Sequence, residues 1–77
     1  MHDALIWELV EQHTGRHRPA TLTVAEFAQI LGISRGAAYK AVGGGEIQSF
    51  RILSTVRIPI SEVFRLLAAM TAETTAV

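Results

Sequence analysis

The sequence predicts one mainly α-helical domain that carries a small β-hairpin. Apolar residues recur at helical spacing in several segments, two short β-type runs lie together late in the chain, and glycines separate these segments. A length of 77 residues with 49% apolar composition allows one small core. The chain has no cysteine, which excludes disulfides and thiolate metal sites. We therefore treat residues 1–77 as a single domain.

The first predicted helix covers residues 3–14, with Asp3 as its cap and Gly15 at its end. The side chains that share its apolar face are Leu5, Ile6, Leu9, Val10 and His13. Trp7 lies off this face, where it either covers a neighbouring element or remains available to a partner. We expect the apolar face to pack on the rest of the domain or against a second subunit. A short basic linker over 16–21 follows.

Two short helices separated by a tight turn come next. The first is predicted over 23–31, because Thr23 and Glu26 form a capping box that satisfies two free backbone N–H groups. A glycine ends it, and Ser34 can cap a second helix over 35–42. A glycine-containing gap of about three residues between two short helices is the helix-turn-helix spacing.

A hairpin and a last helix complete the pattern. Three glycines over 43–45 end the second short helix, and strand-like runs over 49–52 and 56–58 are joined by a turn over 53–55. Apolar residues at helical spacing then predict a helix over 60–70.

The order of these elements predicts a winged helix-turn-helix over residues 21–67, preceded by an extra N-terminal helix over 3–14. Residues 71–77 have no periodicity, and we expect them to be a frayed tail.

In this order, the pieces resemble the excisionase-type helix-turn-helix family, small relatives of the MerR-type DNA-binding domain. The matching pieces are LTVAEFAQILGIS, AAYKAV, the Gly-Glu-Ile that follows it, and the VRIP that ends the wing. Members include excisionases (recombination directionality factors) of phages and mobile elements, and small transcriptional regulators. The resemblance implies a recognition helix in the major groove and a wing that touches the minor groove or its phosphates.

The chain departs from the family pattern at three places. Relatives often carry Arg-Ser-Gly where this chain has glycines over 43–45, and their wing turn is commonly rich in Arg, Gly or Lys where this chain reads Leu-Ser-Thr over 53–55. A hydroxyl-bearing residue is common where Gly36 and Ala37 stand. These departures imply weak binding by one copy.

The positive charge is concentrated in the segment that resembles the DNA reader. The formal net charge is zero, which argues against a simple polycation. Six of the seven Lys and Arg residues nevertheless lie within 16–57, together with two of the seven acidic residues. If all six contacted phosphate, the affinity would fall about a thousandfold between 50 and 200 mM salt.

Ten residues are candidates for DNA contact, in the recognition helix, the wing and the linker. They are Ser34, Arg35, Gly36, Ala37, Tyr39 and Lys40, then Arg51 and Arg57, then Arg16 and Arg18. Arg35, at the start of the recognition helix, can donate to guanine O6 and N7. Ser34 and Lys40 can contact phosphate.

Other roles stay open for the same residues. Tyr39 either contacts DNA or packs against the wing. Gly36 and Ala37 either permit close approach to base edges or let the two short helices pack. The wing arginines either form a cationic edge, if they lie opposite each other or on one face, or are exposed charges that keep the sheet edge soluble.

No catalytic, cofactor or metal chemistry is predicted. The sequence has no Ser/His/Asp arrangement and no phosphate-binding glycine loop, since the 43–45 run lacks the lysine and helix of a P-loop. His13 and His17 have metal-like spacing, but Gly15 between them interrupts the helix. We expect no enzyme and no membrane span, and a cytoplasmic, nucleoid-associated protein of a bacterial or phage-infected cell.

The favoured function is a small sequence-specific protein that binds double-stranded DNA as an excisionase does. It would bind cooperatively, through self-association on DNA, bend the DNA and steer an integrase toward excision. The alternatives are a small transcriptional repressor without a recombinase partner, and a protein-interaction module that retains the fold.

Overall fold

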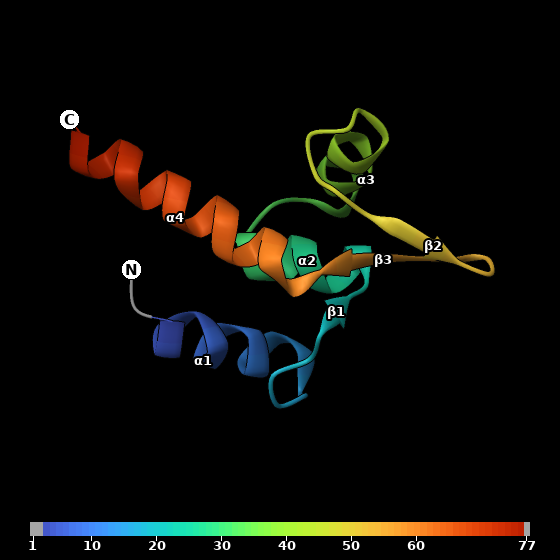
Figure 1. The fold of residues 1–77 in the computed structure, drawn as a ribbon, viewed down its shortest axis with the longest axis horizontal. Coiled ribbons are helices and arrows are strands. Elements are labelled where there is room, and N and C mark those ends of the chain that lie inside the picture. The colour runs from blue at the N-terminus through green and yellow to red at the C-terminus, as the bar shows by residue number, and fades with distance from the viewer. Residues whose placement is uncertain (1–2, 77) are drawn as a thin grey trace.

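The computed structural model describes residues 3–76 and has the predicted mainly helical architecture (Figure 1). Four helices and three short strands follow one another within this range. Their order is α1 (Asp3–Thr14), β1 (Thr21–Leu22), α2 (Val24–Leu31), α3 (Arg35–Gly43), β2 (Phe50–Ile52), β3 (Thr55–Pro59) and α4 (Ile60–Ala76). The fold is thus a helix-turn-helix with a wing, preceded by one extra helix.

The wing is one part of a three-stranded antiparallel sheet of order β1-β3-β2. The sequence analysis placed 16–21 in a linker and did not predict β1, whose two residues are too few to show strand alternation. Leu22 in β1 pairs with Ile58 in β3, and both side chains are fully buried. The wing is therefore anchored at its base by the segment that enters α2.

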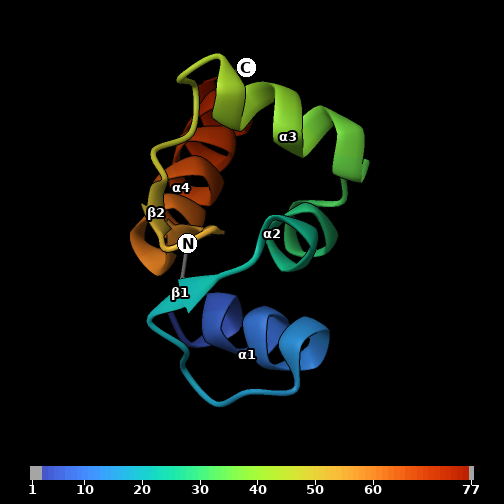
Figure 2. The ribbon, with the colours of Figure 1, turned by 90° about the vertical axis from the view of Figure 1, so that its right-hand side faces the viewer.

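The core lies around α2, between α1 on one side and α3 on the other (Figures 1 and 2). Phe27 of α2 is fully buried at its centre. The other buried apolar residues are Ile6, Val10, Leu22, Val24, Ala28, Ile30, Ala38, Ile47, Ile58 and Val63. Every helix and the connection between α3 and β2, through Ile47, contribute to this cluster, which fixes the orientation of α3 and of the wing.

The N-terminal helix packs on the core, as predicted, but through a narrower face. Ile6 and Val10 are buried, whereas Leu5 is 54% and Leu9 37% exposed. Ile6 and Val10 are four residues apart and lie on one line along the helix. Leu5 and Leu9 each precede one of them by one residue, so they lie about 100° around the helix from the buried line. Trp7 covers a neighbouring element, since its ring meets the Phe64 ring of α4 edge to face at 5.2 Å.

The ends of α2 and the start of α3 follow the predicted chemistry, whereas Asp3, the expected cap of the first helix, lies within the first turn of α1. The backbone N–H of Glu26 donates to Thr23 Oγ1 at 3.1 Å and the Thr23 N–H donates to Glu26 Oε1 at 3.0 Å, which completes the capping box. Gly32 ends α2 in the left-handed region, with φ 73°. Ser34 Oγ accepts from the Ala37 N–H at 3.1 Å and caps α3.

Several predicted boundaries were wrong: Gly43 belongs to α3, β2 begins at Phe50 rather than at residue 49, and the wing turn and the last helix also differ. Thr55 belongs to β3, so the wing turn is shorter than the expected 53–55. The last helix continues past the predicted end at residue 70 to Ala76, through most of the expected tail, because this stretch contains no Pro or Gly to stop it. Val77 lies outside the described residues.

Candidate nucleic-acid interface

Three elements meet around one open hollow on the surface. The first turn of α2, the outward side of α3 and the tip of the wing all contribute to its lining. The lining residues are Thr23, Val24, Ala25, Arg35, Tyr39, Ser54, Thr55 and Val56. A helix and a wing that face a common hollow form the surface with which a winged helix-turn-helix meets a duplex.

One side of α3 is committed to the fold and the other is free. Ala38 is fully buried, and Ala41 and Val42 are half-buried beside it. The candidate residues of α3, its cap included, are all exposed: Ser34, Arg35, Gly36, Ala37, Tyr39 and Lys40. Ala38 therefore faces the core and Ala37 faces solvent. The outward side of α3 carries small side chains at its start together with the basic residues Arg35 and Lys40.

Packing does not account for Gly36. A Cβ placed on Gly36 would meet no atom within 4 Å, and its φ does not lie in the left-handed region. The interpretation that a small residue is needed here for helix packing is therefore wrong at this position. A glycine that costs helix stability and meets open space is compatible with close approach by a ligand.

The seven basic residues fall into two groups according to their partners. Among the described side chains, those of residues 3–69, Arg35, Lys40 and Arg51 have no ion pair or side-chain hydrogen bond, and all three are exposed on α3 or the wing. The other four, Arg16, Arg18, Arg57 and Arg65, each have an intramolecular partner. Only the first group is free to meet phosphate without breaking a contact.

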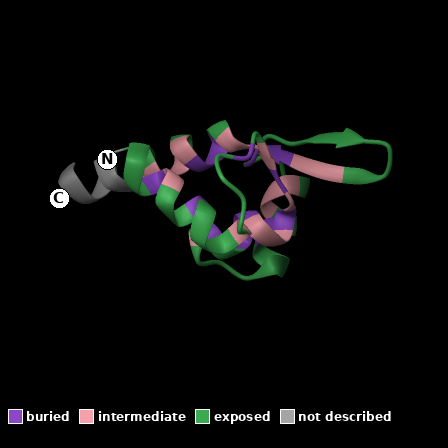
Figure 3. Ribbon diagram, turned by 90° about the horizontal axis from the view of Figure 1, so that it is seen from below, coloured by how far each residue is buried: buried purple, intermediate pink, exposed green. Residues whose placement is uncertain are grey.

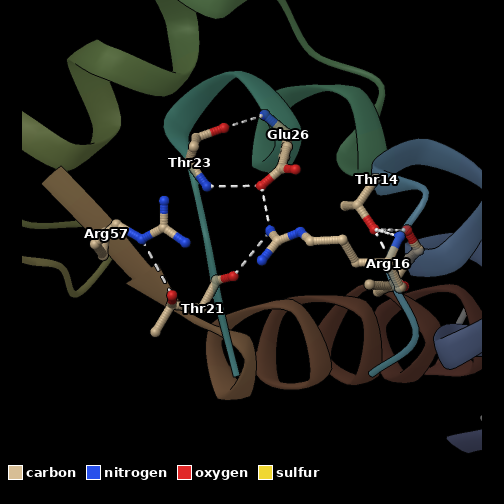
Figure 4. Close-up of polar contacts among 7 residues, drawn as sticks. Thr14, Arg16, Thr21, Thr23, Glu26 and Arg57 are labelled. Carbon is tan, nitrogen blue, oxygen red and sulfur yellow. Dashed lines mark hydrogen bonds and ion pairs between the residues drawn. The ribbon is translucent and has the colours of Figure 1, made fainter. Parts of the chain in front are cut away.

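The linker arginines are engaged in two different ways. Arg16 Nη2 donates to Glu26 Oε1 at 2.7 Å and to the carbonyl oxygen of Thr21 at 3.2 Å, so it extends the capping box of α2 (Figure 4). The Arg18 guanidinium lies over the Trp7 ring, 5.3 Å from its centroid. Trp7 belongs to α1, on the opposite side of α2 from α3.

The two wing arginines do not form the single cationic edge that was one expectation. Arg51 pairs with Val56 and Arg57 with Phe50, so the two arginines project from opposite faces of the hairpin. Arg57 Nε donates to Thr21 Oγ1 at 3.1 Å, which ties it to β1 (Figure 4). Arg51 alone remains available at the wing.

A buried glutamate that the sequence analysis missed positions this surface. Glu62 of α4 accepts from the Gln48 N–H at 2.7 Å and from Arg65 through two bonds of 2.9 Å. Arg65 also donates to the Glu46 carbonyl at 3.2 Å. These bonds fix the loop that leads from α3 to β2. The spacing of Glu62 and Arg65, three apart on a helix, was the signal available in the sequence.

The same contacts shift the titration of Glu62. Hydrogen bonds from Arg65 lower the pKa of Glu62 below its ordinary value of 4.5. Burial of the carboxyl group opposes this shift, while the Gln48 N–H bond and the charge of Arg65 add to it. The carboxylate form therefore holds the loop at neutral pH.

Comparison with known families agrees with this geometry. The chain matches the helix-turn-helix domain family over residues 21–71, more than half of its length. It belongs to the helix-turn-helix domain family. This match covers α2, α3, the wing and the first part of α4 and leaves α1 outside. No curated protein and no solved structure matches the chain.

Membership in the helix-turn-helix domain family indicates DNA as the partner, and such domains are typically non-catalytic. The narrower resemblance to excisionases and MerR-type domains stays a prediction. Among the side chains that the structure describes, no three His, Asp or Glu side chains gather as metal ligands would, and His17 Nδ1 lies 3.1 Å from Glu11 Oε2. No helix in the described part of the chain is long and apolar enough to span a bilayer.

Proposed function

We propose that this chain is a sequence-specific DNA-binding protein of excisionase type, which binds cooperatively, bends its site and directs an integrase toward excision. The observation that carries the DNA-binding part is the grouping of free basic side chains. Arg35 lines the hollow shared by α2, α3 and the wing. Lys40 lies exposed on α3, and Arg51 lies exposed on the wing. In this proposal α3 enters the major groove and the wing follows the adjacent backbone.

Each free residue has a distinct role in the proposed complex. Arg35, at the first turn of α3, donates to guanine O6 and N7 and selects the base. Lys40, one turn later, and Arg51, on the wing, neutralise phosphates and set the register without reading sequence. Gly36 and Ala37 keep the outer surface of α3 low enough for the helix to approach base edges.

The number of basic side chains without an intramolecular partner limits the DNA affinity of one copy. Lys40 and Arg51 at phosphates and Arg35 in the groove place three free cations at the duplex, which sets an upper limit of about −2.7 for the salt slope and about 40-fold for the affinity loss between 50 and 200 mM salt. A single small module also buries only about 600–1,000 Å² on DNA. One copy is therefore a weak binder, which supports cooperative assembly or help from a larger partner such as an integrase.

Selection from a library of random duplexes tests the DNA-binding part. We expect one sequence to be enriched, and Arg35→Ala to lose about 5- to 150-fold in affinity for it while relaxing the preference at one base pair. Arg18→Ala is the matched control, because Arg18 is an exposed arginine engaged with Trp7. Equal, salt-insensitive behaviour of parent and Arg35→Ala would contradict DNA reading and favour a protein-interaction module.

Reconstituted recombination tests the excisionase part. If an integrase gene lies beside this one, excision reconstituted with that integrase and its attachment sites should require this protein, and Arg35→Ala should reduce the product. Excision that proceeds equally without the protein would contradict this role. Specific DNA binding without any effect on excision would assign the chain to the class of small repressors.

A further inference from the structure

The tip of the wing carries an apolar side chain that the fold does not explain. Ile52 pairs with Thr55, so a two-residue turn of Leu53 and Ser54 joins β2 to β3. The Leu53 side chain is 94% exposed, and the neighbouring Ile52 is 56% exposed. Figure 3 shows this hairpin extending from the body with an exposed tip. The most exposed large apolar residue of the described chain is thus at its most projecting turn.

Leu53 also has an unfavourable backbone conformation for its type. Its φ is 57°, in the left-handed region that glycine, asparagine and aspartate favour. A positive φ at Leu53 but not at Ser54 matches the type II′ turn, where glycine is the usual first residue. A leucine at this position therefore adds backbone strain and exposed apolar surface without adding to the core. Strain of this kind points to a function outside the fold.

The position of the tip favours DNA over protein as its partner. Ser54 and Thr55, directly after Leu53, line the same hollow as Arg35 and Tyr39 of α3. Arg51, two residues before Leu53, is exposed and has no partner among the side chains of residues 3–69. The apolar tip is therefore continuous with the basic surface rather than separate from it. When α3 occupies a major groove, a wing in this position reaches the adjacent minor groove.

We propose that Leu53 is a wedge that inserts from the minor groove between two base pairs and kinks the duplex. Ile52 supports it from the strand, and Arg51 holds the flanking phosphate. Apolar side chains inserted in this way unstack one step and bend DNA by about 20–90° toward the major groove. Pyrimidine–purine steps such as TA unstack most easily, so the wedge also selects a flexible step at a site the protein does not read by hydrogen bonds.

This inference rests on the proposed function, and its test separates the two. The probe is the duplex enriched by selection, with 2-aminopurine placed at each TA or CA step beside the α3 site and with the bend measured by circular-permutation gel shift. The parent should bend the duplex and raise 2-aminopurine fluorescence at one step. Leu53→Ala and Leu53→Gly should bind within about tenfold of the parent, lose most of the bend and leave the fluorescence at its free level.

Two controls keep the result interpretable. Leu5→Ala removes another exposed leucine, on α1, and should bend DNA as the parent does. Leu53→Gly suits the positive φ, so its melting temperature should equal or exceed that of the parent. A parent complex with straight DNA, or an unchanged bend in Leu53→Gly, would overturn the wedge while leaving DNA binding intact.

The remaining outcomes are also decisive. If Leu53→Gly keeps the bend and loses cooperative binding of several copies, the wedge is wrong and the tip contacts protein. If the parent binds none of the selected duplexes, the proposed function and the wedge both fail.

Discussion

The two sides of α2 use their arginines differently. On the side of α1 and the linker, Arg16 is held by Glu26 and Arg18 by Trp7. On the side of α3 and the wing, Arg35 and Arg51 are exposed and have no partner within the described chain. A count of charges treats these residues alike. Their contacts separate arginines that build the fold from arginines that are free to bind a polyanion.

The largest expected effect concerns Glu62, which anchors the loop on the side of α3 and the wing. Glu62→Ala removes the acceptor for the Gln48 N–H and for Arg65, and we expect the free energy of unfolding to fall by about 1.5–3 kcal/mol. DNA binding should weaken as well, because the loop between α3 and the wing loses its anchor. Chemical denaturation and gel shift measure the two effects, with Glu8→Ala, an exposed glutamate on α1, as control. Unchanged stability in Glu62→Ala would contradict the positioning role.

The same carboxylate predicts a pH dependence. Since contacts with Arg65 lower the pKa of Glu62 in the folded state, the unfolded chain binds more protons in the interval between the two pKa values. The contribution of Glu62 is therefore present above its ordinary value of 4.5 and is lost as the pH falls through the lower, folded pKa. Unfolding curves from pH 7 to pH 3 should lose stability in this range, and Glu62→Gln should lose less. Parallel curves for both proteins would refute this linkage.

A smaller effect compares one arginine from each side. Arg16→Ala breaks a partly exposed ion pair and should cost about 0.5–1 kcal/mol of stability with no change in the salt slope of DNA binding. Arg51→Ala should leave stability unchanged and make the salt slope shallower by about 0.9. If Arg16→Ala instead reduced the slope, the linker would belong to the DNA contact and the division by partners would be wrong.

The smallest effect concerns Gly36. Replacement by alanine should stabilise the fold by up to about 1 kcal/mol, since the added methyl group meets open space in a helix. DNA affinity should nevertheless fall, because the methyl group stands on the surface that approaches the bases. Gly43→Ala is the control, as Gly43 also faces open space but lies at the far end of α3. Equal affinity of both variants would show that Gly36 does not meet DNA.

Local chemistry made most of the fold predictable. The capping box at Thr23, the glycine stop at Gly32 and the Ser34 cap act within four residues, so the sequence specifies them directly. The sheet was harder, because β1 depends on pairing with a strand more than thirty residues away. The expected face of α1 was too wide, since spacing alone does not say how much of an apolar stripe a neighbour covers.

The sequence predicted where the candidate DNA-binding surface lies, but not which basic side chains are free on it. The sequence located the basic residues in the helix-turn-helix and wing. It did not reveal that Arg16 reaches Glu26, ten residues away, or that strand register sends Arg51 and Arg57 to opposite faces. Both facts depend on tertiary packing. Together with the contact of Arg18 with Trp7, they reduce the six expected phosphate-binding residues to three.

The salt dependence of DNA binding tests this reduction most directly. The affinity of the parent for its selected duplex, measured by fluorescence anisotropy between 50 and 200 mM salt, gives the slope of log K against log salt. The three free cations Arg35, Lys40 and Arg51 predict a slope no steeper than about −2.7, whereas six phosphate contacts would give about −5.4. A value near the first supports the division of the basic residues by their partners. A value near the second would contradict it.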